Sequence, residues 1–450
     1  MKKGCLKIGL GLSLLASSLL AAVEKPNLKI GFIALTDCAP IVIAKEKGFF
    51  AKHGLNVDVV KEGGGWAGIQ QKVGNGEYDF SHMLAPMPIA STLGINGNIP
   101  MNAVMSLDYN GNGITLENKL IEEMKAQGMN EAVRPVSASY LKKALEARKK
   151  TGNKDTVEFG MTYPTGTHNY ELRYWLAAGG IDPDTDVTLK VFPPPTMVSN
   201  LQAGNTNGYC VGEPWNERAV MAKLGNAIVT KHEIWNNGPE KVLGSKADFV
   251  KTNPETTKAV IKAILEASMW LDASWENRKE ASKILSKKEY VNAPVDVLDN
   301  SMTGTFMYMN GKTESNPAFN VFANNYASYP YYSHAVWFMT QMYRWGQLDK
   351  AVDMKKVAEQ VYRPDIFASA AKEVGYKLPT TAWKKDGEDK TNKFLDGKVF
   401  DPNKAVDYIY GFGVKHVKVK QADLAKINKW SVKTAAVPYN CPAGKPGCIK

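Results

Sequence analysis

The sequence lacks the features that mark membrane-spanning, fibrous and nucleic-acid-binding proteins. Its 450 residues contain no apolar run of the ~20 residues that a membrane-spanning helix needs. Repeats of about 20–50 residues and low-complexity tracts are also missing, which excludes solenoid and fibrous architectures. Lys and Arg outnumber Asp and Glu by 56 to 45, but the lysines are scattered, so the basic excess is diffuse and does not indicate nucleic acid as a partner.

The N-terminus has the pattern of a secretory signal peptide. Lys2, Lys3 and Lys7 supply a positive start, and the apolar run Leu6–Ala22 ends in small residues. This run is too short to cross a bilayer ~30 Å thick at ~1.5 Å per residue. We therefore predict a signal peptide over residues 1–22 and a mature chain that is periplasmic and soluble after cleavage.

Cysteine is scarce, with five residues in the chain. Cys5 precedes the apolar run, so a lipid anchor is not expected. The other four leave an even number in an oxidising compartment, where disulfides can form. Cys441 and Cys448 flank a turn-rich hexapeptide, and we predict a disulfide there that pins the tail. Cys38 and Cys210 either pair with each other or are small buried hydrophobic side chains.

Strand and helix patterns alternate along the chain, which indicates an α/β fold. Strands are predicted at residues 28–35, 55–59, 78–80, 157–163, 187–192 and 207–211, and helices at 36–47, 168–178, after Pro214 and after Asn253. The chain after the last of these helices is predicted to be mostly helical to Lys372, and 384–397 to be a surface loop. The predicted organisation is a first lobe over 23–134, an inserted lobe over 135–230, a return to the first lobe over 231–380 and a C-terminal extension over 381–450.

Several turns lie after a predicted strand and before a predicted helix, where free backbone N–H groups and the helix dipole favour an anion. They are Thr36-Asp37-Cys38, Gly64-Gly65-Trp66, Thr165-Gly-Thr-His168 and Gly212-Glu-Pro-Trp215. Helix caps use the same residue types, and Asp37 is interpreted as a cap without ligand contact. Together the turns predict a site for a small anion in a crevice between two lobes.

At these turns the chain resembles the nitrate/bicarbonate-binding family of ABC importers. The matching motifs are Leu35-Thr-Asp-Cys-Ala-Pro40, Ala44-Lys-Glu-Lys-Gly-Phe-Phe50, Thr165-Gly-Thr-His-Asn169, Arg173-Tyr-Trp-Leu-Ala-Ala-Gly-Gly-Ile-Asp182, Cys210-Val-Gly-Glu-Pro-Trp-Asn216, Pro239-Glu-Lys-Val-Leu-Gly244, His334-Ala-Val-Trp-Phe-Met-Thr-Gln341 and Tyr362-Arg-Pro-Asp-Ile366. The resemblance implies a two-lobed periplasmic binding protein of type II topology with a helical C-terminal extension. It further implies high-affinity binding of nitrate, or of nitrite, and delivery to an inner-membrane permease with a cytoplasmic ATPase.

The resemblance also assigns the ligand-binding residues. The pocket tryptophan of the nitrate-binding branch falls on Trp66, its histidine on His168, its glycine on Gly212 and its lysine on Lys241. Its glutamine aligns with Asn112, which carries the same amide one methylene shorter. Catalytic residues, a metal and a cofactor are not expected; calcium is expected only if the ligand is bicarbonate.

Nitrate accepts hydrogen bonds and donates none, so a matching pocket should hold donors and a positive charge, with no carboxylate facing the ligand. Lys241 therefore favours nitrate. In the bicarbonate branch an acidic residue replaces this lysine and calcium assists, and Glu240 beside Lys241 keeps that alternative open. A periplasmic nitrate sensor is a second alternative. An enzyme with Cys38 as nucleophile and His168 as base is a third, and we predict that the chain is not an enzyme.

Overall fold

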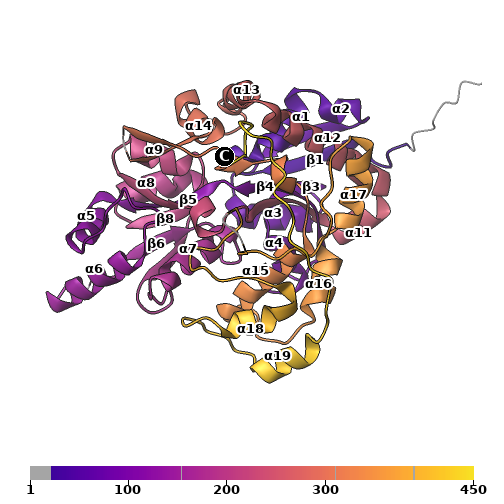
Figure 1. Ribbon diagram of the computed structural model, residues 1–450. Helices are drawn as coiled ribbons and strands as arrows, with labels where there is room; N and C mark the ends of the chain where they lie inside the picture. Colours follow the sequence, from indigo (N-terminus) through magenta and orange to yellow (C-terminus); the bar gives the residue numbers. More distant parts are fainter. Residues whose placement is uncertain (1–21, 154, 310, 389–390, 450) are drawn as a thin grey trace, which may run out of the picture.

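The computed structural model describes residues 22–153, 155–309, 311–388 and 391–449. The predicted signal peptide, apart from Ala22, lies outside these residues. Figure 1 shows two sheet-containing lobes side by side, with additional helices of the C-terminal part packed beneath and behind them. Within the described ranges, none of the helices combines the length and apolar character needed to cross a membrane.

The first lobe contains a six-stranded sheet in the order β13-β4-β10-β3-β1-β2. β1 runs parallel to β2 and β3, whereas β10 runs antiparallel to both β3 and β4. Helices cover both faces, and the inner strands β3, β4 and β10 are accordingly buried almost throughout. The strands are β1 (Asn27–Phe32), β2 (Asn56–Lys61), β3 (Phe80–Leu84), β4 (Met101–Asn110), β10 (Pro239–Lys246) and β13 (Asn320–Val321).

The second lobe contains a five-stranded sheet in the order β7-β6-β8-β5-β9. β5 and β9 flank the chain's two passages between the lobes: Gly111 joins β4 to β5, and residues 231–238 join β9 to β10. This architecture confirms the predicted two-lobed α/β class. The strands are β5 (Asn112–Glu117), β6 (Glu158–Met161), β7 (Thr188–Val191), β8 (Gly208–Gly212) and β9 (Gly225–Thr230).

The second sheet begins upstream of residue 135, where we placed the start of the inserted lobe. β5 pairs with β8 and β9, so the chain enters this lobe at Asn112. The short passage depends on Gly111, which has a φ of 85°. A Cβ at this position would lie 2.5 Å from Asn320 Oδ1 and 2.9 Å from Asp108 Oδ2, so only glycine fits the passage.

Helices surround both sheets. Those of the first lobe are α1 (Ala39–Glu46), α2 (Phe49–Lys52), α3 (Gly65–Gly74), α4 (Met87–Thr92), α11 (Ala247–Thr252), α12 (Pro254–Ala273), α13 (Trp275–Leu285), α14 (Val295–Met302), α15 (Tyr332–Arg344), α16 (Met354–Val361) and α17 (Pro364–Glu373). Those of the second lobe and its return passage are α5 (Asn118–Ala126), α6 (Ser139–Lys150), α7 (Thr167–Ala178), α8 (Met197–Gln202), α9 (Trp215–Met221) and α10 (Lys231–Ile234), and the C-terminal extension adds α18 (Ala405–Tyr410) and α19 (Gln421–Ile427).

The region predicted as helical to Lys372 also contains a hairpin, which the sequence reading missed. It consists of β11 (Thr305–Met309) and β12 (Lys312–Ser315), which pair antiparallel. Phe306 of this hairpin stacks on Phe319 with ring centroids 4.5 Å apart. The hairpin is therefore held by its own small apolar cluster, which packs against Val220 of α9.

The segment 384–397 was predicted to be a surface loop, and this prediction is wrong for its buried positions. Phe394 is buried and stacks on Trp235 and Trp337 at centroid distances of 5.2 and 5.9 Å. Lys384 is buried as well, and its Nζ lies 2.9 Å from Asp386 Oδ1. The polar composition concealed this burial because the charges pair with each other while one aromatic ring anchors the segment.

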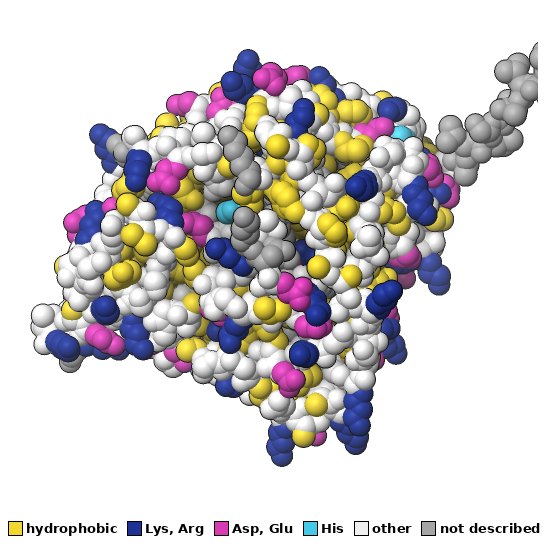
Figure 2. Space-filling view, in the orientation of Figure 1, with side chains coloured by type: hydrophobic (Ala, Val, Ile, Leu, Met, Phe, Trp, Pro, Cys, Tyr) yellow, Lys and Arg dark blue, Asp and Glu magenta, His cyan; other side chains and the backbone are white. Residues whose placement is uncertain are grey.

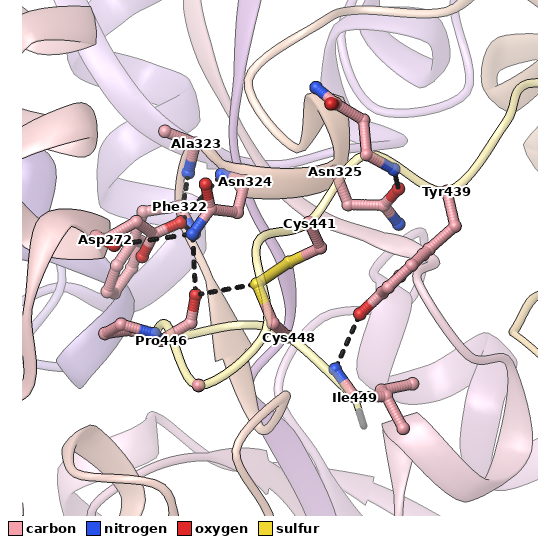
Figure 3. The surroundings of a disulfide bond; sticks show 12 residues. Asp272, Phe322, Ala323, Asn324, Asn325, Tyr439, Cys441, Pro446, Cys448 and Ile449 are labelled. Atoms are coloured by element: carbon pink, nitrogen blue, oxygen red, sulfur yellow. Dashed lines mark hydrogen bonds between the residues drawn. A yellow bond between two sulfur atoms is a disulfide. The ribbon is translucent and has the colours of Figure 1, made fainter.

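The predicted disulfide between Cys441 and Cys448 is present (Figure 3). The loop that it closes reaches the first lobe, where Asn324 Nδ2 donates to Pro446 O at 2.8 Å. Within the tail itself, Ile449 N donates to Tyr439 Oη at 2.6 Å. Cys38 and Cys210 are buried free thiols. They therefore act as small buried side chains and do not pair with each other. The tail thus lies on the first lobe, at the end of the molecule opposite to the helices α18 and α19 (Figure 1).

Candidate functional site

The charged and polar side chains at the junction of the two lobes form one buried group, which we call the interlobe cluster. Asp37 and His82 come from the first lobe, Asn112, His168 and Glu171 from the second, and Lys231, Glu240 and Lys241 from the return passage and β10. Each of these side chains is at most 1% exposed. Charges buried this deeply must be paired, and the pairing decides what the cluster can bind.

Lys241 has two carboxylate partners. Its Nζ lies 2.6 Å from Asp37 Oδ2 and 2.6 Å from Glu240 Oε1. Burial by itself would lower the pKa of Lys241, but the two carboxylates outweigh this and raise the pKa above its ordinary value. The lysine therefore carries a full positive charge inside the protein.

Glu240 and Lys241 are neighbours in sequence, yet both side chains enter the cluster. Successive residues of a regular strand point to opposite faces. Here the register of β10 against β4 shifts between Pro239 and Lys241, and again between Lys241 and Val242, so the strand is bulged at this point. A bulge changes the direction of a side chain locally and is common beside functional sites.

The carboxylate of Glu240 lies at the centre of the cluster. Oε1 accepts hydrogen bonds from Thr167 Oγ1 at 2.8 Å and from Lys241 Nζ at 2.6 Å, and His168 Nε2 lies 3.0 Å away. Oε2 accepts from Asn112 Nδ2 at 2.9 Å and from Lys231 Nζ at 3.0 Å. The expectation that no carboxylate faces the predicted donors is therefore wrong.

His168 is the second residue of α7. Its Nδ1 lies 2.8 Å from Thr162 Oγ1, on the side of the ring opposite to Glu240. Burial lowers the pKa of His168 to about 3, so the ring is neutral. A neutral ring that accepts from the threonine hydroxyl keeps its Nε2–H to donate into the cluster.

Lys231 and Glu171 are members of the cluster that sequence reasoning missed. Lys231 Nζ contacts Glu171 Oε1 and donates to Pro239 O at 2.9 Å. Burial raises the pKa of Glu171 to about 7, against the opposing effect of Lys231. A signal for Glu171 existed: it follows Thr167 and His168 at the spacings that place residues on one helix face. Lys231 had no comparable local signal.

Asp37 was interpreted as a helix cap, and the structure corrects this. Its side chain makes no capping bond to the short helix that contains it, Thr36–Cys38, nor to α1. Instead Oδ1 lies 2.9 Å from His82 Nε2, and Oδ2 bonds to Lys241. His82, a residue of β3 that sequence reasoning did not single out, thus orients the carboxylate that holds the lysine.

Trp66, in the first turn of α3, adds an unused donor. Its indole Nε1 is buried and lacks a hydrogen-bond partner among the described residues. The ring centroid lies 5.7 Å from Lys241 Nζ and 5.4 Å from the ring of His82. A buried N–H without a partner costs free energy unless a ligand meets it, so this group is a candidate ligand contact.

Gly212 ends β8 at the point where the second lobe meets the first. A Cβ on this residue would lie 3.2 Å from Leu35 Cδ2 and 3.4 Å from Asp37 Oδ2. The glycine therefore allows the two lobes to approach closely beside the cluster. All five predicted residues, Trp66, Asn112, His168, Gly212 and Lys241, thus lie in or directly beside the cluster.

A cavity of about 750 Å³ lies in the cleft between the lobes. Ala34 and Gly65 line it from the first lobe, and Pro193, Trp215 and Arg218 line it from the second. Gly65 directly precedes Trp66, so the open cleft reaches the edge of the cluster. On the outer surface, Lys and Arg side chains are interspersed with Asp and Glu over the face seen in Figure 2, in agreement with a diffuse charge.

The proposed nucleophile and base of the enzyme alternative do not form a pair. The ring nitrogens of His168 face Thr162 and Glu240. Cys38 packs in the apolar core of the first lobe, where burial raises the pKa of its thiol well above the ordinary value. A protonated thiol is a poor nucleophile.

Two lobes, two passages of the chain between them and a buried polar site at their junction define the class of two-lobed ligand-binding proteins. The NMT1-like family matches residues 21–286. Over 406 residues the chain is 38% identical to the nitrate/nitrite binding protein NrtA of Nostoc sp. (strain PCC 7120), covering 88% of this chain and 87% of that protein. Over 397 residues it is 40% identical to the nitrate import ATP-binding protein NrtC of Synechocystis sp. (strain PCC 6803), covering 87% of this chain and 56% of that protein.

The fold agrees with these matches. The crystal structure of the periplasmic nitrate-binding protein NrtA from Synechocystis PCC 6803 superposes on this chain with a TM-score of 0.79 and 34% sequence identity. The superposition covers 87% of this chain and 100% of that one. The chain belongs to the NMT1-like family, and its resemblance to the nitrate/bicarbonate-binding proteins of ABC importers is confirmed.

Proposed function

We propose that this chain binds nitrate outside the cytoplasm and delivers it to an ABC importer. The observation that supports the proposal most directly is the buried ammonium of Lys241, which sits 5.7 Å from the ring of Trp66, whose indole N–H is unused. Nitrate needs a positive charge and donors, and Asn112 and His168 supply two more donors in the same cluster.

The number of contacts is sufficient for tight binding. Hydrogen bonds to a charged group contribute about 1.5–3 kcal/mol each. Four of them, from Trp66, Asn112, His168 and Lys241, amount to a gross ~6–12 kcal/mol. Micromolar affinity corresponds to about 8 kcal/mol. Nitrate is thus held with micromolar affinity or better after the cost of ordering the site.

Delivery to a transporter follows from the kind of relatives that the chain has. One of them is a nitrate/nitrite binding protein, and another is an ATP-binding protein of nitrate import. The partners proposed here are accordingly an inner-membrane permease and its cytoplasmic ATPase. Deletion of the gene should abolish nitrate uptake at low nitrate concentration; a strain that kept its uptake but lost a nitrate response would favour the sensor instead.

Bicarbonate is the competing ligand because Glu240 faces the cluster, and a carboxylate beside the site could bind calcium. Calorimetric titration of the purified protein with nitrate, nitrite, bicarbonate and cyanate, each with and without calcium, separates the alternatives. We expect nitrate to bind at micromolar concentration or below, without an effect of calcium. Heat released by bicarbonate alone, and only with calcium present, would overturn the proposal.

A further inference from the structure

Glu240 has the shape and the charge of the proposed ligand. A carboxylate and nitrate are both planar, carry one negative charge and present acceptor oxygens in one plane. The Glu240 carboxylate accepts from Asn112, Lys231 and Lys241 and lies 3.0 Å from His168 Nε2. Three of these four donors are residues assigned to the bound anion. The side chain therefore contacts the donors that the resemblance assigns to the anion.

The charges of the cluster favour replacement of one carboxylate by nitrate over binding of nitrate in addition to it. The carboxylates of Asp37 and Glu240 face the ammonium groups of Lys231 and Lys241, so two negative charges meet two positive ones. Glu171, which also contacts Lys231, and Asp108 face the cluster as well, and burial raises the pKa of each, to about 7 for Glu171. Glu171 therefore adds part of a further negative charge near neutral pH, and neither group adds a positive one. The imidazoles of His82 and His168 are neutral because burial lowers their pKa. A third anion would have no compensating charge, whereas replacing one carboxylate by nitrate keeps the balance.

The bulge of β10 at Glu240 lets the Glu240 side chain move without loss of strand pairing. The backbone carbonyl of Glu240 accepts from Ala85 N at 3.1 Å, which ties the residue to the first sheet. On the other side, the register against β4 passes directly from Pro239 to Lys241. Glu240 is the extra residue there, so rotation about its side-chain bonds leaves the ladder intact.

Trp66 distinguishes the two anions. The third substituent on the carboxylate carbon of Glu240 is its own side chain, which accepts no hydrogen bond. The third substituent on the nitrogen of nitrate is an oxygen. The indole N–H of Trp66, which lacks a partner among the described residues, can donate to that oxygen. Nitrate thus gains a contact that no carboxylate in the same position makes.

We propose that Glu240 is an internal competitor: its carboxylate fills the anion site of the ligand-free protein, nitrate displaces it, and free monocarboxylates are thereby excluded. The proposal rests on the nitrate-binding function proposed above. A tethered carboxylate has a high effective concentration, which formate or acetate must overcome with no additional contact. Nitrate overcomes it through its third oxygen. Glu240 is accordingly a residue that determines specificity.

The test uses Glu240→Ala and Glu240→Gln in the full-length mature protein, with formate and nitrate as probes. In Glu240→Ala, formate should bind and compete with nitrate, and it should raise the melting temperature of the variant but not of the wild type. In Glu240→Gln, the neutral amide holds the two lysines less well, so nitrate affinity should rise about tenfold. Glu233→Gln is the matched control, because Glu233 is a partly buried carboxylate of α10 that accepts hydrogen bonds from Thr230 outside the cluster.

The outcomes separate the two proposals. If the wild type fails to bind nitrate, the proposed function falls. A second outcome is that the wild type binds nitrate while formate neither binds Glu240→Ala nor competes with nitrate. In that case the Glu240 side chain does not occupy the anion site, and only the competitor proposal falls. Should Glu240→Ala not fold, a crystal of the wild-type protein soaked with nitrate decides: nitrate in contact with Lys231 and Lys241, with the Glu240 carboxylate moved away, supports displacement. Nitrate bound beside an unmoved Glu240 overturns it.

Discussion

Lys241 Nζ lies 2.6 Å from Asp37 Oδ2, although the two residues are 204 positions apart in the chain. The contact joins the loop after β1 to the strand by which the chain returns from the second lobe. It depends on the long-range pairing of the first sheet, in which β3 lies between β1 and β10 and so brings the two residues together. The interlobe cluster is thus a product of the topology, and its properties can be tested residue by residue.

Replacing Lys241 by Met should weaken nitrate binding at least tenfold. Without this ammonium, Asp37 and the bound anion share the single positive charge of Lys231, and a lost charge-assisted bond costs about 1.5–3 kcal/mol. Calorimetry measures the change, and circular dichroism checks that the variant is folded. Lys246→Met, at the other end of β10, is the control and should bind as the wild type does. Unchanged affinity in Lys241→Met would remove this lysine from the site.

Replacing Trp66 by Phe should preserve the fold and lower nitrate affinity about tenfold or more, the equivalent of one hydrogen bond to a charged group of about 1.5–3 kcal/mol. The ring remains to pack on His82, and only the indole N–H is lost. Trp270→Phe, on the part of α12 that is partly exposed, serves as the comparison. Equal affinities for both variants would show that the N–H of Trp66 does not reach the anion.

Nitrate affinity should rise as the pH falls from about 8 to about 6, by at most about tenfold per pH unit. Burial raises the pKa of Glu171 to about 7, so this carboxyl gains a proton in that range. Protonation removes one negative charge beside Lys231 and Glu240, which favours an additional anion. His168, with its pKa lowered to about 3, stays neutral throughout. Glu171→Gln should abolish the pH dependence; a slope that persists in this variant would assign it to another group.

Replacing Cys441 and Cys448 together by Ser should lower the free energy of unfolding by about 2–3 kcal/mol, the value expected for a short loop. The bond closes a loop across a sequence separation of 7 and pins the tail to the first lobe (Figure 3). Because neither cysteine belongs to the interlobe cluster, nitrate affinity should not change. Chemical denaturation and calorimetry on the same samples test both statements, and a parallel loss of affinity would contradict the second.

Several features could be predicted from local patterns because they depend on near neighbours. The apolar runs of β1, β6 and β8 identified the α/β class, and the turns after them pointed to an anion site. The spacing of Cys441 and Cys448 predicted their bond. Lys241, Trp66 and His168 were found through motifs that resemble those of a family, and the structure brings all three together. The signal peptide and the identity of the ligand stay predictions.

Other features depended on pairing between distant segments, which no local pattern contains. The bulge in β10 arises from its register against β4, and it leaves Glu240 outside the ladder, beside Lys241. The start of the second sheet at Asn112 depends on which strands lie beside β5.

The sequence by itself determined the class of protein, the place of the site between two lobes and the positive charge of Lys241. The tertiary structure decided that the carboxylate of Glu240 lies among the predicted donors. The reason is that side-chain direction in a strand follows from its register, and the strength of a buried charge pair follows from how completely water is excluded around it. The register of β10 is set when the first sheet forms, and water is excluded from the cluster only when both lobes are folded against each other.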